Sequence, residues 1–314
     1  INKNQCEWDS FENNFKNNYT TFCSELFKKK ETSSGAIVSL PHELQTNIQV
    51  NSSISLINRN SSFPSARNTL SGSNVFIIGN SVFRHYSFSL LAFLEGLPHD
   101  ISINRTAEKS SCQGSGIYSA CDHYSKVSQT LIRFSWNIKL GNNTCDDLRR
   151  DICYGLDDDN TTNCFMKLFK GSTSKDVLLL GSIPANNQLW CQRRLNTMGS
   201  IRLLFENYLQ PNITSVEMAR AMGNMLLTVF PGRVLWISYP VLNILNSDPT
   251  VNDLIMTVNK MVRDGVRGVH DPRLAYLNLA PLQLEHLHQY SDVIHHPGTL
   301  SETIIRLISN MLNP

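Results

Sequence analysis

Short apolar runs alternate with amphipathic stretches along the second two-thirds of the chain. Strands are predicted where β-prone apolar residues follow one another between turn residues, at 75–78, 131–140, 176–181, 233–238 and 274–279. Helices are predicted where apolar residues recur every three or four positions, at 82–94, 215–230, 252–264 and 300–312. Strands that alternate with helices in this way favour an α/β fold, a three-layer α/β/α sandwich around a parallel sheet.

The first 73 residues are polar and follow a different pattern. Aromatic residues between Cys6 and Cys23 recur at helical steps, so this segment is predicted to be a helix tied by a disulfide. Residues 33–73 are expected to be extended and to wrap the main domain, with an edge strand in the run from Gly35 to Leu40. The predicted organisation is therefore an extension, 1–73, and a main domain, 74–314, in which 96–128 is a loop region.

Residues 141–175 are interpreted as a Cys-rich insertion into the main domain. This segment contains an acidic run from Asp157 to Asp159, but the run lacks the ligand spacing of a recognised calcium loop. A solvated acidic turn is therefore the favoured interpretation, and neither a metal nor any other cofactor is expected.

Composition bounds the function and indicates the compartment. The net charge of +2 gives no argument for nucleic acid, and no apolar run approaches the ~18 residues of a membrane span. Eight cysteines without zinc-site spacing, together with seven N-x-S/T sequons, predict a disulfide-bonded glycoprotein of the secretory pathway, extracellular, at the cell surface or in the Golgi lumen. The cysteines are Cys6, Cys23, Cys112, Cys121, Cys145, Cys153, Cys164 and Cys191, and the sequons begin at Asn18, Asn51, Asn60, Asn104, Asn142, Asn160 and Asn212. Cys6–Cys23 and Cys112–Cys121 are the simplest pairs, and the start at Ile1 is compatible with removal of an upstream signal peptide or anchor.

Candidate chemistry begins at the stretch from Asn74 to Leu94. An apolar strand runs into Gly79, Asn80 and Ser81, and a helical pattern follows at once. Such a turn lifts a serine to the carboxyl end of a sheet, beside helix N–H groups that can stabilise an oxyanion. The alternative is an ordinary strand–helix turn in which Ser81 is only the N-cap.

A second candidate stretch lies just before the last predicted helix. Asp292 and His295 are three residues apart, so that in a turn their side chains can point to one side. A serine nucleophile needs an imidazole base, and the imidazole needs an acceptor that fixes its tautomer. His296 is the near rival of His295, and only the spacing to Asp292 separates them. His270, His286 and His288 are interpreted as solvated loop residues.

These two stretches together resemble the SGNH (GDSL-type) hydrolase superfamily. IIGNSVFR, in which Gly79, Asn80, Ser81 and Arg84 stand at the motif positions, and the late SDVIHHPG are most similar to its PC-esterase branch. That branch includes trichome-birefringence-like polysaccharide O-acetyltransferases, sialate O-acetyltransferases and neurexophilin-and-PC-esterase proteins. DVLLLGSIPANN, 176–187, resembles the middle block of the family, and RVLWISYP, 233–240, resembles the strand that follows it. The resemblance implies that Ser81 is the nucleophile, His295 the base and Asp292 its orienter, with the Ser81 N–H as an oxyanion donor.

Two positions depart from the pattern of this family. Asn80 stands where the family has an Asp, and Gly181 and Ser182 stand where the middle block usually supplies an Asn. Asn186 or Asn187 could supply that group if the loop folds back. The leading hypothesis is an esterase or O-acyltransferase, without a cofactor, whose partner is a glycan or another acyl ester. The alternative is a catalytically inactive glycoprotein of the same fold that binds protein partners at a cell surface or in an extracellular assembly.

Overall fold

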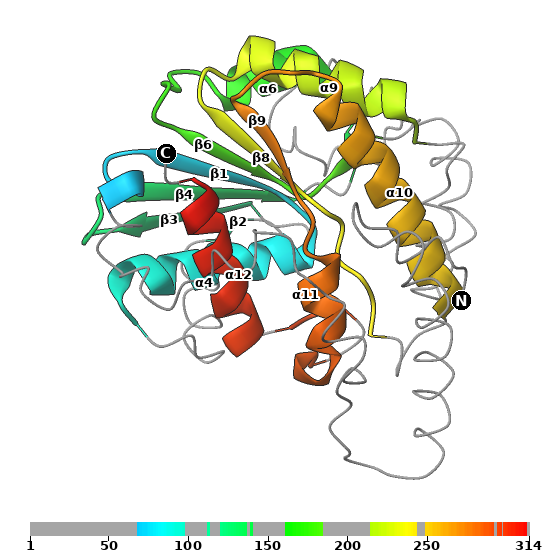
Figure 1. The fold of residues 1–314 in the computed structure, drawn as a ribbon. Coiled ribbons are helices and arrows are strands. Elements are labelled where there is room, and N and C mark those ends of the chain that lie inside the picture. The colour runs from blue at the N-terminus through cyan, green and yellow to red at the C-terminus, as the bar shows by residue number, and fades with distance from the viewer. Residues whose placement is uncertain are drawn as a thin grey trace.

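The computed structural model describes residues 68–97, 112–113, 120–136, 139–140, 161–184, 214–243, 249–291, 294–296 and 298–312 (Figure 1). Its strands are β1 (Asn74–Gly79), β2 (Cys112–Gln113), β3 (Ala120–Ser125), β4 (Thr130–Trp136), β5 (Lys139–Leu140), β6 (Val177–Leu180), β7 (Ile183–Pro184), β8 (Arg233–Ile237) and β9 (Leu274–Leu277). Its helices are α4 (Ser81–Glu95), α6 (Thr161–Leu168), α9 (Val216–Val229), α10 (Pro249–Arg267), α11 (Ala280–Glu285), the short 3₁₀ turn η3 (Leu287–Gln289) and α12 (Thr299–Met311).

Seven of these strands form one sheet in the order β2-β3-β4-β1-β6-β8-β9. Five neighbouring strands pair in parallel, namely β4, β1, β6, β8 and β9. Strands β2 and β3 add an antiparallel edge beside β4. The α/β fold class is therefore confirmed for the described residues. The predicted parallel sheet is confirmed for these five strands. Strands β2 and β3, which lie inside the predicted loop region 96–128, are antiparallel and are a correction to that prediction.

Strand β1 occupies the centre of the sheet and is also its switch point. The chain leaves β1 for β4 on one side and then continues through β6, β8 and β9 on the other. The register aligns Gly79 with Trp136 and Ile78 with Leu180, so the carboxyl ends of β1, β4 and β6 meet at one edge. In open parallel sheets, ligands bind outside the carboxyl ends of the strands at such a point.

The apolar runs form the middle of the core, as their sequences require. Every residue of β6, VLLL, is buried, and so are Val75 to Gly79 of β1 and the last four residues of β8, RVLWI. Strands that are covered on both faces read as continuous apolar runs. This is why the sequence pattern locates these three strands to within a residue or two.

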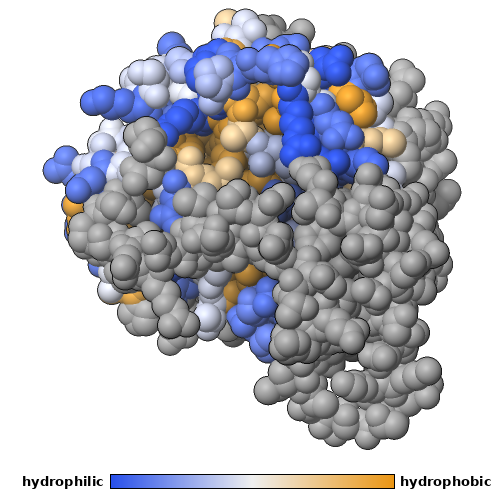
Figure 2. Space-filling view, in the orientation of Figure 1, coloured by the Kyte–Doolittle hydropathy of each residue, from blue (hydrophilic) through white to orange (hydrophobic). Residues whose placement is uncertain are grey.

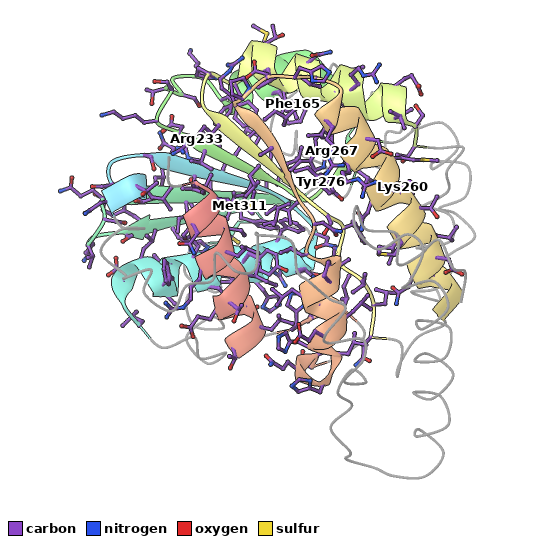
Figure 3. The ribbon with its side chains drawn as sticks, viewed as in Figure 1. Phe165, Arg233, Lys260, Arg267, Tyr276 and Met311 are labelled. Atoms are coloured by element: carbon purple, nitrogen blue, oxygen red, sulfur yellow. The ribbon has the colours of Figure 1, made fainter. Side chains whose placement is uncertain are left out.

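Helices cover both faces of this sheet, an arrangement compatible with the predicted three layers (Figure 1). Helices α4 and α12 pack on one face, and α6, α9 and α10 lie on the other. On α10, the apolar positions Val251, Ile255, Val258, Val262 and Val266 are buried. Figure 2 shows hydrophilic side chains around the rim of this face and a patch of apolar side chains between them. The end of α12 is tied to the sheet by Arg233 at the start of β8, which donates from Nη1 to the carbonyl of Leu312 (Figure 3).

Helix α6 comes from the end of the segment that the sequence analysis interprets as an insertion. Phe165 on this helix and Phe169 just after it are buried, and their rings stack with centroids 5.6 Å apart. The ring of Phe169 also packs against two others: its centroid is 5.1 Å from that of Phe76 on β1 and 4.8 Å from that of Phe230 after α9. The aromatic cluster therefore joins residues 165–169 to the central strand and to the helix layer on that face (Figure 3).

Of the extension, only residues 68–73 are described. Residues 68–70 are helical and Leu70 is buried in the core, so the prediction of an extended chain up to residue 73 is wrong at this end. Residues 1–67, the asparagines of all seven sequons, the acidic run at 157–159 and Cys6, Cys23, Cys145, Cys153 and Cys191 lie outside the described residues. Cys121 on β3 is disulfide-bonded, and Cys112 on β2 stands opposite it in the strand register. The pairing of these two cysteines stays a prediction.

His123 on β3 is a histidine buried in the core. It is 4% exposed, its Nε2 lies 3.4 Å from Oγ of Ser87 on α4, and its ring lies 4.7 Å from the ring of Phe88. Burial disfavours the charged imidazolium and lowers the pKa of His123 from 6.5 to about 4. The folded chain therefore keeps His123 neutral at a pH at which the unfolded chain binds a proton.

We expect the free energy of unfolding to fall as the pH is lowered from 6.5 toward 4. In this range His123 binds a proton in the unfolded state but stays neutral in the folded state. One pKa unit corresponds to about 1.4 kcal/mol, so the contribution lost approaches about 3 kcal/mol. Chemical denaturation at a series of pH values measures it. His123→Gln should flatten this part of the profile, whereas His288→Gln, at an exposed histidine, should not. An unchanged slope in His123→Gln would contradict the assignment.

Candidate active site

The turn after β1 places Ser81 at the first position of α4, not at its cap. Asn80 is the N-cap: its backbone is extended, and its Oδ1 accepts the N–H of Val82 at 3.0 Å. The Asn80 carbonyl accepts the N–H of Arg84 at 3.1 Å, which starts the helical ladder. The alternative in which Ser81 itself caps the helix is therefore wrong. With the cap supplied by Asn80, the Ser81 hydroxyl can bond elsewhere.

The hydroxyl of Ser81 meets His295, which is 214 residues away in the sequence. Oγ of Ser81 and Nε2 of His295 are 2.7 Å apart, and both side chains are half-buried. The backbone carbonyl of His295 accepts the N–H of Ser291 at 2.8 Å and its Oγ at 3.2 Å. These two bonds fix the segment between η3 and α12 that presents the imidazole. The structure thus brings together the predicted serine and the predicted histidine at hydrogen-bond distance.

The neighbouring His296 points into the core instead. It is 3% exposed, and its Nε2 lies 2.7 Å from the hydroxyl of Tyr86 on α4. Its Nδ1 lies 3.2 Å from the carbonyl of Ile294. Of the two rival histidines, His295 is the one that contacts Ser81.

Two further predicted residues, Asp292 and Asn186, lie outside the described residues, as does Asn187. Asp292 therefore stays a predicted orienter of His295. Arg84 lies three residues after Ser81 on α4 and is half-buried, and its carbonyl accepts the hydroxyl of Ser87 at 2.7 Å.

His85 is a site residue that the sequence analysis missed. It lies four residues after Ser81, on the same face of α4, and its ring centroid is 5.0 Å from that of His295. The ring is half-buried, like those of its neighbours at the site. A histidine directly after the Arg of the motif has no local signal that marks it. Its proximity to Ser81 could have been inferred only from the helical spacing.

The N-terminus of α4 provides the electrostatics expected for an oxyanion. The N–H groups in the first turn of a helix have no acceptor within the helix, and their aligned dipoles favour negative charge. The N–H of Val82 is taken by the Asn80 cap, whereas the N–H of Ser81 belongs to the same turn and adjoins the Ser81 hydroxyl. Beneath the turn, burial raises the pKa of the Tyr239 hydroxyl well above its ordinary value, although the adjacent Asn80 side chain opposes this shift. Tyr239 is therefore neutral and adds no negative charge to the site.

The opposite side of the site, at the end of β6, is closed. The N–H of Gly181 donates to the carbonyl of Ile78 at 2.7 Å, so this N–H cannot serve as the oxyanion donor. A Cβ at Gly181 would lie 1.9 Å from Cζ of Phe83, and a Cβ at Gly79 would lie 2.5 Å from Cγ of the same ring. Gly79 and Gly181 are thus the surface on which Phe83 packs. The carbonyl of Ser182 accepts Nε1–H of Trp236 at 2.9 Å.

Within the described part of the chain, no group of three or more His, Cys, Asp or Glu residues is arranged to hold a metal ion. Among the described helices, none has both the length and the apolar character needed to cross a membrane. No protein-family model matches the sequence, and no curated protein matches it. The functional argument therefore stands on the geometry of the fold and of the site.

We expect Gly181→Ala to destabilise the fold by about 1–3 kcal/mol, the usual cost of overpacking a core. The new methyl group would collide with the far end of the Phe83 ring, which is buried and cannot swing away. Denaturation of Gly181→Ala, Phe83→Leu and the double variant forms a double-mutant cycle. Leu lacks the outer ring atoms, so the double variant should lose less stability than the two single losses together. Simple additivity would show that Phe83 is not the obstacle.

Proposed function

We propose that this chain is a serine-dependent ester hydrolase or O-acyltransferase of SGNH type that acts on O-acyl, above all O-acetyl, groups of a glycan. The observation that supports it most directly is the 2.7 Å contact between Oγ of Ser81 and Nε2 of His295. Its position gives it weight, because Ser81 begins a helix at the carboxyl end of the strand at which the sheet order reverses. Nucleophile and base within hydrogen-bond reach are the signature of covalent catalysis.

The proposed chemistry has two half-reactions. Ser81 Oγ attacks the acyl carbon while His295 Nε2 takes the hydroxyl proton, and the oxyanion forms beside the first turn of α4. The intermediate collapses with cleavage of the bond to the sugar oxygen, which leaves as an alcohol with the proton from His295. Water or a second sugar hydroxyl then attacks the acyl-enzyme as His295 removes its proton. Collapse breaks the bond between the acyl carbon and Ser81 Oγ, which takes back the proton from His295 Nε2, and releases the acid or the new ester.

The substrate class comes from the resemblance described above. The contact between a serine early in the domain and a histidine late in it supports this use of the resemblance, in which the motifs lie early and late in the domain. Glycan O-acyl esters also fit a chain with sequons and cysteines of secretory character. Secretory localisation, glycosylation and the remaining disulfides belong to the same proposal.

The alternative function, an inactive SGNH-fold glycoprotein with a binding or assembly role, is favoured by one specific observation. The N–H of Gly181 is used within the sheet, and Phe83 fills the space where a side chain at position 181 would stand. The loss of one oxyanion donor costs about 10²–10³ in rate. The choice between the two functions thus depends on whether Ser81 reacts.

Covalent labelling with a fluorophosphonate tests that reactivity directly. We expect the folded wild type to be labelled once and Ser81→Ala not at all. His295→Ala should be labelled about 10²–10⁴ times more slowly, the usual contribution of a general base. Ser71→Ala, which alters an exposed serine at the other end of β1, is the matched control and should be labelled like the wild type.

Labelling should be followed by mass spectrometry of the modified peptide and by release of acetate from acetylated glycans. Absence of labelling in folded wild-type protein, or equal labelling of Ser81→Ala, would overturn the enzymatic proposal and leave the binding function.

A further inference from the structure

A second contact joins the two segments that carry Ser81 and His295, one layer below the candidate site. Tyr86 lies on α4, five residues after Ser81, and His296 directly follows His295. The Tyr86 hydroxyl and Nε2 of His296 are 2.7 Å apart, and both residues are buried, at 1% and 3% exposure. The helix and the segment are therefore connected by a half-buried contact at the site and by a fully buried contact beneath it.

The direction of the buried hydrogen bond follows from the partner of the other ring nitrogen. Nδ1 of His296 lies 3.2 Å from the carbonyl oxygen of Ile294, and a carbonyl oxygen can only accept. Nδ1 therefore carries the hydrogen, and in the neutral ring Nε2 is an acceptor for the hydroxyl hydrogen of Tyr86. Burial raises the pKa of the Tyr86 hydroxyl far above its ordinary value, so that this group remains a donor.

The surroundings of His296 leave its ring little freedom. Its ring centroid is 5.7 Å from that of Tyr86 and 4.9 Å from that of Tyr290. Tyr290 is itself held by a 2.9 Å hydrogen bond from its hydroxyl to the carbonyl of Val241. The His296 carbonyl accepts the hydroxyl of Ser301 on α12 at 2.5 Å. His296 is thus fixed from α4, from the end of η3 and from α12.

We propose that Tyr86 and His296 are positioning residues, whose hydrogen bond sets the distance between Ser81 and His295. This inference rests on the proposed function. The half-buried Ser81–His295 contact must compete with water, whereas the buried pair cannot exchange its partner for solvent. Because His295 and His296 are adjacent, fixing the second ring limits where the first can lie. A displacement of about 1 Å at reacting groups can cost 10²-fold in rate.

Tyr86→Phe tests the proposal, because it removes the hydroxyl and keeps the ring that packs in the core. We expect fluorophosphonate labelling of Ser81 to slow about 10- to 100-fold. Tyr276→Phe is the control: it removes the hydroxyl of another, half-buried tyrosine, which donates to the carbonyl of Asn259 at 3.1 Å on the far edge of the sheet (Figure 3). It should lose some stability, which denaturation measures alongside that of Tyr86→Phe, and keep the wild-type labelling rate.

Two further measurements separate positioning from a general loss of stability. ¹⁵N NMR of the histidine rings should show His296 as the neutral form with hydrogen on Nδ1, and this signature should change in Tyr86→Phe. His296→Gln, which retains an acceptor near the place of Nε2, should keep most of the labelling rate, whereas His296→Met should lose it.

Equal labelling rates for wild type, Tyr276→Phe and Tyr86→Phe would overturn the positioning role and leave the proposed function intact. Equal slowing in Tyr86→Phe and Tyr276→Phe would also overturn it, because the effect would then be one of stability. An unlabelled wild type would overturn both proposals, and the control variants distinguish these cases.

Discussion

The candidate site depends first on the hydrogen bond by which Asn80 caps α4. Because Oδ1 of Asn80 satisfies the N–H of Val82, the helix needs no hydroxyl at its N-terminus, and Ser81 becomes its first residue. The serine hydroxyl is thereby released toward His295. An Asp at this position would make the same bond and add a negative charge at the helix N-terminus. The uncharged amide of Asn80 makes the cap without opposing an oxyanion that forms beside Ser81.

The second constraint is the central place of β1 in the sheet. Parallel pairing with β4 and β6 fixes both sides of the strand, so the position of Gly79 at its end is determined by buried neighbours. The Phe83 ring then closes over Gly79 and Gly181, the last position of one strand and the position just after another. The start of α4 is therefore held by backbone pairing below and by aromatic packing at its side. The position of the start of α4 therefore depends little on the half-buried hydrogen bond between Ser81 and His295.

Particular residues show how much of this the sequence could predict. The continuous apolar runs of β6 and β8 locate these strands because both of their faces are buried. Strand β3 was missed because its buried positions include His123 and Ser125, and these polar side chains do not produce an apolar alternation. Ser81 and His295 carried recognisable motifs and were predicted together. His85 and the bond between Tyr86 and His296 were not, because none of these residues stands at a motif position and a contact over 210 residues leaves no local pattern.

At the end of β6, the N–H of Gly181 is already hydrogen-bonded, and this limits the rate of ester cleavage that the proposed site could support. A serine–histidine pair supplies the nucleophile and the base, but the barrier also depends on donors aimed at the developing oxyanion. At the described residues such donors come from the first turn of α4, because the N–H of Gly181 is committed to the carbonyl of Ile78. If the loop after Ser182 supplies no second donor, the expected penalty is about 10²–10³ in rate. Under the proposed function, a well-aligned Ser81–His295 pair would then be accompanied by slow turnover.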